Sequence, residues 1–427
     1  MERLAIIGTG IAGMGCARLL YGRREITLFD PNDHVGGHSN TVTLEEGNRD
    51  IAIDTGFMVF NKVTYPLLTR LFEEIGAPVK KTSMSFSVQH LPTGLEYCGS
   101  SINHLFAQRR NVFRPRYWRL LQQINRFNQE AVPALKEPQT RLLSVGDYVE
   151  NRRYGGDFLS FYLIPMSSAV WSTDSETVLR FPALSLLNFF HNHGFLGLHT
   201  QHQWWTIEGG AKSYVKRLVE PFKDRIHLQR GILGVTTESN GVVLETHDGE
   251  RLTFDKVILA CHGDQALELL KEPDKSQRGV LDKFRYQSNL ATLHTDSRVM
   301  PKTKLAWSSW NHRTEEDSNG RPQSSTIYWM NSLQDVSQRQ DYFVSINGEN
   351  RIQENLILKQ IQYEHPLFDL DAVAAQDQLP GLNRQSPDQR IYFCGSYFRN
   401  GFHEDALESA VDVSRVVLGD EFDSEWA

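Results

Sequence analysis

The fold of this chain is decided by residues 4–13, LAIIGTGIAG. Residues 4–7 are an apolar run that predicts a short buried strand, and residues 14–21 have the composition of a helix. Between them, Gly8 permits a tight turn, Gly10 lets the backbone approach a diphosphate, and Gly13 lets the helix pack closely on the strand. A strand, a glycine turn and a helix in this order are typical of a dinucleotide site.

An acidic residue downstream supports this interpretation. The second predicted strand, residues 25–29, ends at Asp30, which follows Gly10 by about 20 residues. At that separation a carboxylate accepts hydrogen bonds from the ribose hydroxyls of an adenine dinucleotide. NAD and FAD share this half, so these residues alone do not distinguish them.

Three further segments favour FAD, because the longer cofactor must be followed across the whole domain. Gly36 and Gly37 form a second glycine pair, where backbone can approach the dinucleotide. Residues 51–57 alternate like a strand and contain Asp54 and Gly56. Residues 391–396 predict a buried strand that breaks at glycine, followed by a helix over about 404–417, whose amino terminus would stabilise negative charge on a reduced flavin.

These motifs, together with residues 205–210, resemble the flavin-containing amine oxidase and phytoene-desaturase-like superfamily, in the same order along nearly the whole chain. Residues 56–61, 84–88, 307–311 and 401–405 resemble more narrowly a bacterial branch of predicted NAD/FAD-binding proteins linked to cyclopropane-fatty-acid-synthase-like genes. One member of that branch is associated with desaturation of methyl-branched acyl chains on phospholipids. The resemblance therefore implies a lipid-linked substrate.

The sequence departs from the superfamily in two places. Ser396 stands where many relatives carry an acidic residue, so a hydroxyl would replace a carboxylate beside the cofactor. The aromatic pair that encloses the amine in amine oxidases has no clear counterpart, although Tyr397, Phe398 and Phe402 lie nearby in the sequence. We expect the change at Ser396 to leave cofactor binding intact. The missing aromatic pair argues against amine oxidation.

Motifs and resemblance together predict a non-covalent FAD site. Its predicted residues are Gly8, Gly10, Ile11, Ala12, Gly13, Asp30, Pro31, Gly36, Gly37, His38, Gly56, Phe57, Met58, Val235, Gly395, Ser396, Glu404 and Ala406. His403 and Glu404 are the predicted catalytic residues, since a histidine titrates near neutral pH and would stabilise the reduced flavin or relay a proton. The alternative for both is helix capping and first-turn charge.

The predicted fold class is α/β, with two domains. A discontinuous Rossmann-type FAD-binding domain comprises residues 1–60, 206–266 and 387–427, and its middle piece includes a small β-meander. An inserted α+β substrate domain comprises residues 61–205 and 267–386.

Composition narrows the functional classes. The net charge of −7 argues against a general nucleic-acid-binding role. The four cysteines have no metal-type spacing, which favours reduced thiols and a cytoplasmic location. His191, His193, His199 and His202 lack the accompanying pattern of a zinc site, so no metal is predicted and structural roles are favoured.

One segment is unusually basic. Residues 106–127 contain six arginines and no acid, interleaved with Phe113, Tyr117 and Trp118. Such a segment, Arg109–Arg126, suits peripheral contact with the inner membrane face, and the alternative is a solvated arginine surface.

Three functions stay open. The first is an FAD-dependent oxidoreductase that desaturates or oxidises a small-molecule or phospholipid-linked acyl substrate by hydride transfer. The second is a flavin-dependent amine oxidase, which a lysine near the flavin would support; Lys302 and Lys304 are the candidates. The third is a non-catalytic flavoprotein that assists a lipid methyltransferase.

Overall fold

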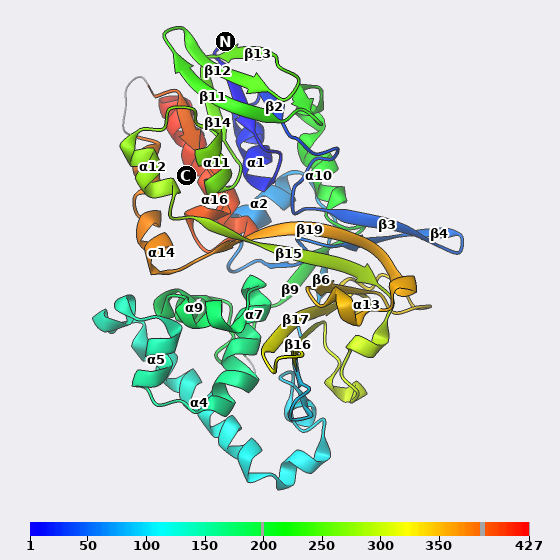
Figure 1. Cartoon of the computed structure of the whole chain (residues 1–427). Helices are drawn as coiled ribbons and strands as arrows, with labels where there is room; N and C mark the ends of the chain where they lie inside the picture. Colours follow the sequence, from blue (N-terminus) through cyan, green and yellow to red (C-terminus); the bar gives the residue numbers. More distant parts are fainter. Residues whose placement is uncertain (198–199, 385–388, 427) are drawn as a thin grey trace.

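A five-stranded parallel sheet in the order β10-β2-β1-β14-β20 forms the upper half of the molecule (Figure 1). The computed structural model describes residues 1–197, 200–384 and 389–426. The five strands are β10 (Ile226–His227), β2 (Glu25–Phe29), β1 (Arg3–Ile7), β14 (Lys256–Leu259) and β20 (Ile391–Phe393).

Both faces of the middle of this sheet are buried, which explains why β1, β14 and β20 are apolar along most of their length. Leu4 and Ile6 of β1 pack into a core shared with α1 (Ile11–Leu20) and α16 (His403–Leu418), two helices that also contact each other. Ala5 and Ile7 point to the other face, toward a three-stranded meander. The meander comprises β11 (Ile232–Glu238), β12 (Gly241–Thr246) and β13 (Arg251–Phe254), and it confirms the predicted one.

A seven-stranded mixed sheet, β19-β15-β18-β17-β16-β7-β8, lies below the parallel sheet. Its strands are β19 (Ile357–Leu367), β15 (Arg285–His294), β18 (Phe343–Ile346), β17 (Pro322–Trp329), β16 (Trp310–Glu316), β7 (Phe86–His90) and β8 (Leu95–Cys98). The long antiparallel pair β15 and β19 runs between the two halves of the molecule in Figure 1.

A group of helices covers the lower left of Figure 1. It comprises α4 (Pro115–Ala134), α5 (Val145–Asn151), α6 (Gly156–Phe158), α7 (Ile164–Trp171), α8 (Ser175–Arg180) and α9 (Ala183–Asn192). Phe127, Phe158 and Phe190 are fully buried among them. Since aromatic side chains bury large apolar areas, these three stabilise the helical group.

Shorter elements connect these parts. They are β3 (Thr41–Glu46), β4 (Arg49–Asp54), β5 (Phe60–Asn61), α2 (Pro66–Glu74), β6 (Val79–Thr82), α3 (Ile102–Leu105), β9 (Trp204–Ile207), α10 (Lys212–Val219), α11 (Gly263–Leu269), α12 (Lys275–Leu281), α13 (Met330–Gln334), α14 (Leu370–Gln376) and α15 (Leu379–Leu382). Among the residues that the structure describes, no helix combines the length and the apolar character needed to cross a membrane.

Three short helices that the sequence division assigns to the substrate domain pack with the parallel sheet. Val280 of α12, Ala372 of α14 and Leu382 of α15 belong to the core beneath the meander, together with β1 and β14. Residues 275–281 and 370–382 therefore pack with the parallel sheet, although the sequence division assigns them to the substrate domain. Short helices give no local signal of the sheet on which they pack.

Candidate functional site

A cavity of about 930 Å³ lies at the carboxyl ends of the parallel strands and extends between the two halves of the molecule. Residues that follow β1, β2, β14 and β20 all line it. Ligands of open α/β sheets bind at this edge, and the volume lies within the range of small-molecule sites.

The glycine turn fits the three roles expected from its sequence. Gly8 has φ +105°, and a Cβ there would lie 2.5 Å from the carbonyl oxygen of Ala260. A Cβ on Gly13 would lie 2.0 Å from the carbonyl oxygen of Gly8, so helix and strand require a glycine where they touch. A Cβ on Gly10 would meet no heavy atom within 4 Å, so this turn is open toward the cavity.

Helix α1 begins at this open turn without a side-chain cap. Its amino-cap residue is Gly10, no acidic residue stands in its first turn, and Ile11 and Ala12 line the cavity. The first N–H groups of a helix have no partner inside the helix, and they carry partial positive charge. This end of the cavity is therefore suited to a diphosphate.

Asp30 lies where the sequence predicted a ribose-binding carboxylate. It is buried, lines the cavity, and its Oδ2 accepts hydrogen bonds from the N–H (2.8 Å) and hydroxyl (2.6 Å) of Thr9. Its Oδ1 accepts two bonds of 2.9 Å from Asn32. These contacts fix the orientation of the carboxylate beside the turn.

The second glycine pair packs on the first turn. The Gly36 N–H donates to the carbonyl oxygen of Thr9 at 3.1 Å, and a Cβ on Gly37 would lie 3.3 Å from the Cα of Gly10. At Gly56, a Cβ would lie 2.2 Å from the carbonyl oxygen of His38. The three glycine-containing segments are thus held at backbone contact along one wall of the cavity.

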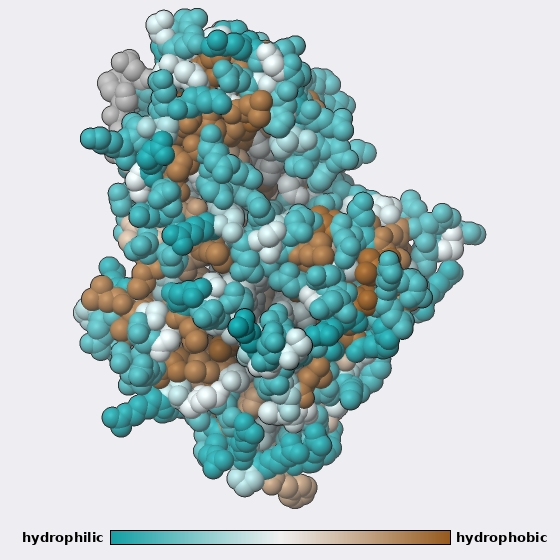
Figure 2. Space-filling model, in the orientation of Figure 1, coloured by the Kyte–Doolittle hydropathy of each residue, from teal (hydrophilic) through white to brown (hydrophobic). Residues whose placement is uncertain are grey.

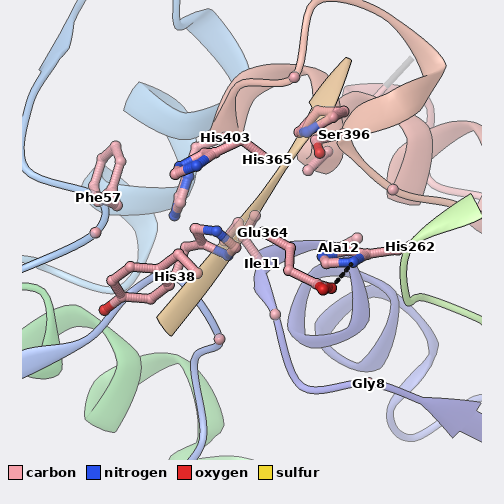
Figure 3. A pocket seen from close by; sticks show the side chains of 18 of the residues that line it. Gly8, Ile11, Ala12, His38, Phe57, His262, Glu364, His365, Ser396 and His403 are labelled. Atoms are coloured by element: carbon pink, nitrogen blue, oxygen red, sulfur yellow. Dashed lines mark ion pairs between the residues drawn. The ribbon is translucent and has the colours of Figure 1, made fainter. Parts of the chain in front are cut away.

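His403 faces the cavity, but burial changes the chemistry expected of it. Its Nε2 lies 3.0 Å from the hydroxyl of Ser39, which also bonds Tyr214, and its ring stacks on Phe57 at 3.9 Å (Figure 3). Burial, together with the neighbouring His38, lowers the pKa of His403 to about 3. The expectation that this histidine titrates near neutral pH is therefore wrong for the flavin-free protein, where its imidazole is neutral.

Glu404 is not among the residues that line the cavity. Its carboxylate accepts hydrogen bonds from the N–H groups of Leu67 (2.8 Å) and Leu68 (2.9 Å), at the start of α2. Burial raises the pKa of Glu404 to about 7. The structure thus gives this predicted cofactor and catalytic residue the capping role that was its alternative, although the helix it caps is α2.

The other predicted cofactor residues divide into two groups. Those that line the cavity are Gly8, Gly10, Ile11, Ala12, Asp30, Pro31, Gly36, Gly37, His38, Gly56, Phe57, Met58, Gly395, Ser396 and Ala406. Gly13 acts through its packing against the Gly8 carbonyl. Val235 does not line the cavity, because its side chain is buried beneath the meander; residues 231–233 reach the cavity in its place.

Several polar lining residues were not predicted from the sequence. His262, after β14, lies 3.4 Å from the carboxylate of Glu364 on β19 (Figure 3). Its ring also stacks on that of Tyr286 at 4.1 Å. The ring of His365 lies 5.4 Å from that of His38. Burial lowers the pKa of His262 to about 4 and that of His365 to about 3, so both are neutral at pH 7. No spacing in the sequence relates these residues, because His38 and His262 lie in loops far along the chain from β19, which carries Glu364 and His365, and only the fold brings them together.

The far end of the cavity is aromatic and apolar. The side chains that line it include Tyr65, Met84, Trp171, Phe189, Phe195, Trp204, Trp310, Tyr328 and Phe402. Phe189 and Phe402 stack at 5.0 Å. Among the described residues that line the cavity there is no lysine or arginine. Lys304 instead lies 3.2 Å above the ring of Trp307, beside a separate pocket of about 200 Å³.

Two of the histidines considered for a metal site have other partners. His193 is buried and bonds the carbonyl oxygen of Phe189 through Nδ1 at 3.0 Å, and His202 bonds that of Asn192 at 2.9 Å. His199 lies outside the described residues. Within the described ranges, no group of three or more histidine, cysteine or acidic side chains is arranged to hold a metal ion.

Comparison with known proteins agrees with this architecture. Residues 11–339 match the family model described as flavin containing amine oxidoreductase. No curated protein sequence matches the chain.

Several solved structures resemble the chain along almost its whole length. One is a redesigned putrescine oxidase (12% identity, 98% of this chain and 99% of that chain, TM-score 0.67). Another is cyclohexylamine oxidase from Brevibacterium oxydans (13% identity, 97% of this chain and 99% of that chain, TM-score 0.67). A third is a CLA-producing fatty acid isomerase from P. acnes (14% identity, 99% of this chain and 99% of that chain, TM-score 0.68). At these identities the similarity concerns the fold, and it confirms the predicted fold class.

Proposed function

Because this chain belongs to the flavin containing amine oxidoreductase family, we propose that it binds FAD non-covalently and oxidises or desaturates an apolar, acyl-type substrate. A flavin cofactor follows from the family, and FAD with a lipid-linked substrate is the narrower proposal. When bound, the flavin accepts a hydride equivalent from the substrate.

The binding residues match the two ends of FAD in chemistry. The uncapped start of α1 and the open space at Gly10 suit the diphosphate, and Asp30 suits the ribose hydroxyls. Ser396 and Ala406, at the carboxyl-terminal strand and helix, line the same cavity farther along the chain. The aromatic side chains line the same cavity, and we assign that end to the substrate.

The apolar character of that end is the observation that carries the substrate class. Three acidic residues line the cavity: Asp30 after β2, Glu268 in α11, and Glu364, which lies beside His262. None of them belongs to the segments that carry the aromatic side chains of that end. Around the aromatic side chains the lining has no cationic group that would bind a free carboxylate. A hydrocarbon chain is stabilised by about 25 cal/mol of transfer free energy per Å² of apolar surface that it buries against these side chains. A charged amine would lose its hydration there without gaining an ionic partner.

His403 is proposed to handle the proton that accompanies hydride removal. Desaturation removes two electrons and two hydrogens, one as hydride and one as a proton that needs an acceptor. The imidazole of His403 is unprotonated, and its pKa of about 3 makes it a weak base, so it would pass the proton along its hydrogen bond to Ser39, which in turn bonds Tyr214, rather than retain it. Phe57 holds the ring in place by stacking.

Amine oxidation is the second candidate, because the family and two of the similar structures are named for amines. An amine would have to enter as the neutral base, since the aromatic end offers no acid. The lysines that would have favoured this candidate, Lys302 and Lys304, are not among the lining residues.

Anaerobic reduction of the flavin tests the proposal. The purified, flavin-loaded protein is mixed with phospholipids that carry methyl-branched, cyclopropane or unmodified acyl chains, and with a set of primary amines. We expect the visible absorbance of the oxidised flavin to bleach with at least one lipid and with no amine. Bleaching by amines alone would favour the second candidate, and no bleaching by either class would favour a non-catalytic flavoprotein.

A further inference from the structure

The lower end of the molecule carries a basic and apolar surface formed by α3, by the short 3-10 helix Arg109–Phe113 and by the start of α4 (Figure 1). We propose that this surface, residues 102–119, docks on the headgroup region of a bilayer that contains anionic phospholipid. The surface would bind lipid whatever substrate the cavity accepts.

The exposed apolar side chains are the first observation. Phe113 is 86% exposed, Ile102 69%, Trp118 46% and Val112 41%. Figure 2 shows an apolar side chain that protrudes at this end of the molecule among hydrophilic neighbours. Single exposed apolar residues are common, but four of them within this one short segment form a cluster of the kind that marks an interaction site.

The charge around this cluster is the second observation. Arg109, Arg110, Arg114, Arg116 and Arg119 are all exposed. Among the described residues only Arg116 of these five has an acidic partner, Asp157, and no acid occurs in the sequence between Glu96 and Glu130. In a chain of net charge −7, this local excess of cations is complementary to an anionic surface.

The surface is also held in one conformation. The indole N–H of Trp118 donates to the carbonyl oxygen of Val112 at 2.8 Å, and the Tyr117 hydroxyl donates to that of Leu105 at 2.6 Å. Arg109 bonds the carbonyl oxygen of Phe106 at 3.0 Å. Because these bonds join the three elements, little conformational entropy is lost when the apolar side chains enter the interface.

A bilayer explains the combination better than a polyanion does. Nucleic acids and acidic proteins would use the arginines, but they do not require Phe113 to be almost fully exposed. Aromatic and aliphatic side chains that alternate with arginine are the composition of interfacial membrane segments, in which the apolar groups enter the acyl boundary and the cations meet the headgroups.

Cosedimentation with vesicles tests the proposal. The full-length protein is mixed with phosphatidylcholine vesicles, or with vesicles of phosphatidylcholine and phosphatidylglycerol, at low and high salt. We expect binding to the anionic vesicles that weakens with salt. Replacing Arg110, Arg114 and Arg119 together by serine should weaken binding about 10²-fold, since each cation contributes about fivefold. Phe113→Ser should weaken it about tenfold or more.

Matched controls separate this surface from general effects. Lys275, Arg278 and Lys283 are exposed cations on and beside α12, and their triple serine variant has the same change in charge. Leu142 is 79% exposed and follows the carboxyl end of α4, a 20-residue helix about 30 Å long, so Leu142→Ser is the control for Phe113→Ser. Thermal unfolding should be the same for variants and controls.

Three results would overturn the proposal. They are equal binding of the parent protein to neutral and anionic vesicles, binding of either test variant as tight as that of its control, and binding of a DNA duplex without binding of vesicles. Weakened binding in both test variants, with both controls at the parental level, would support it.

Discussion

Gly10→Ala should leave the folded protein intact and remove its flavin. Gly10 has φ −63° and ψ 178°, a conformation that alanine adopts, and no heavy atom lies within 4 Å of its would-be Cβ. We therefore expect the free energy of unfolding of the flavin-free protein to change by less than about 1 kcal/mol. The added methyl would occupy the space in front of the first N–H groups of α1.

The loss of affinity follows from the bonds that the methyl would displace. A hydrogen bond from a backbone N–H to a charged group contributes about 1.5–3 kcal/mol. If the diphosphate loses the N–H groups of Ile11 and Ala12, affinity falls by about 3–6 kcal/mol, or roughly 10² to 10⁴-fold.

The assay is a titration of flavin-free protein with FAD, followed by flavin fluorescence. Gly156→Ala is the matched control, because a Cβ at this glycine also meets no atom within 4 Å and Gly156 does not line the cavity. If Gly10→Ala binds FAD within threefold of this control, the diphosphate does not lie at the start of α1.

Asp30→Ala should weaken FAD binding by about 1.5–3 kcal/mol, because the variant loses a charged hydrogen-bond acceptor. Asp33→Ala changes an exposed neighbouring residue and should leave FAD affinity unchanged. Equal FAD affinities of the two variants in the same titration would contradict the assignment of Asp30 to the ribose. His403→Ala should retain flavin but slow its anaerobic reduction by roughly 10²-fold, the lower end of acid–base contributions, and reduction at the parental rate in stopped flow would make His403 structural. Burial lowers the pKa of His312 to about 3, so below pH 6.5 the unfolded state binds a proton that the folded state does not, and stability decreases as the pH is lowered. His312→Phe should therefore reduce the loss of unfolding free energy between pH 7 and pH 5 by about 2 kcal/mol, measured by urea unfolding, with His191→Phe as the exposed control; an unchanged pH dependence would count against it.

Local motifs in the sequence predicted the parallel-sheet half of the fold well. The glycine turn, Asp30 and the second glycine pair each depend on backbone geometry over a few residues, which glycine and a strand end determine directly. The meander and the final strand and helix followed from alternation and from Gly395, with helix α16 found at residues 403–418 against the predicted 404–417.

Contacts between residues far apart in the sequence could not be predicted from such local motifs. Glu364 of β19 reaches His262 in one register only, in which Glu364 lies opposite Ser288 of β15, while Tyr286 of β15 stacks on His262. A slip of one residue would turn Glu364 to the other face of the sheet. Val235 shows the same limit on a smaller scale, since its strand was predicted but the face to which its side chain points was not.

His403 and Glu404 are adjacent in the sequence but have different roles. The contacts of Glu404 help to hold His403 in place. Glu404 binds the first N–H groups of α2 to the first turn of α16. From the other side, Phe57 stacks on His403 and Ser39 bonds its Nε2. The imidazole therefore sits between three fixed segments, and the burial that fixes it also keeps it neutral. A residue so constrained is suited to accept a hydrogen bond or to relay a proton at one position in the cavity, and less suited to sense the pH of the solvent.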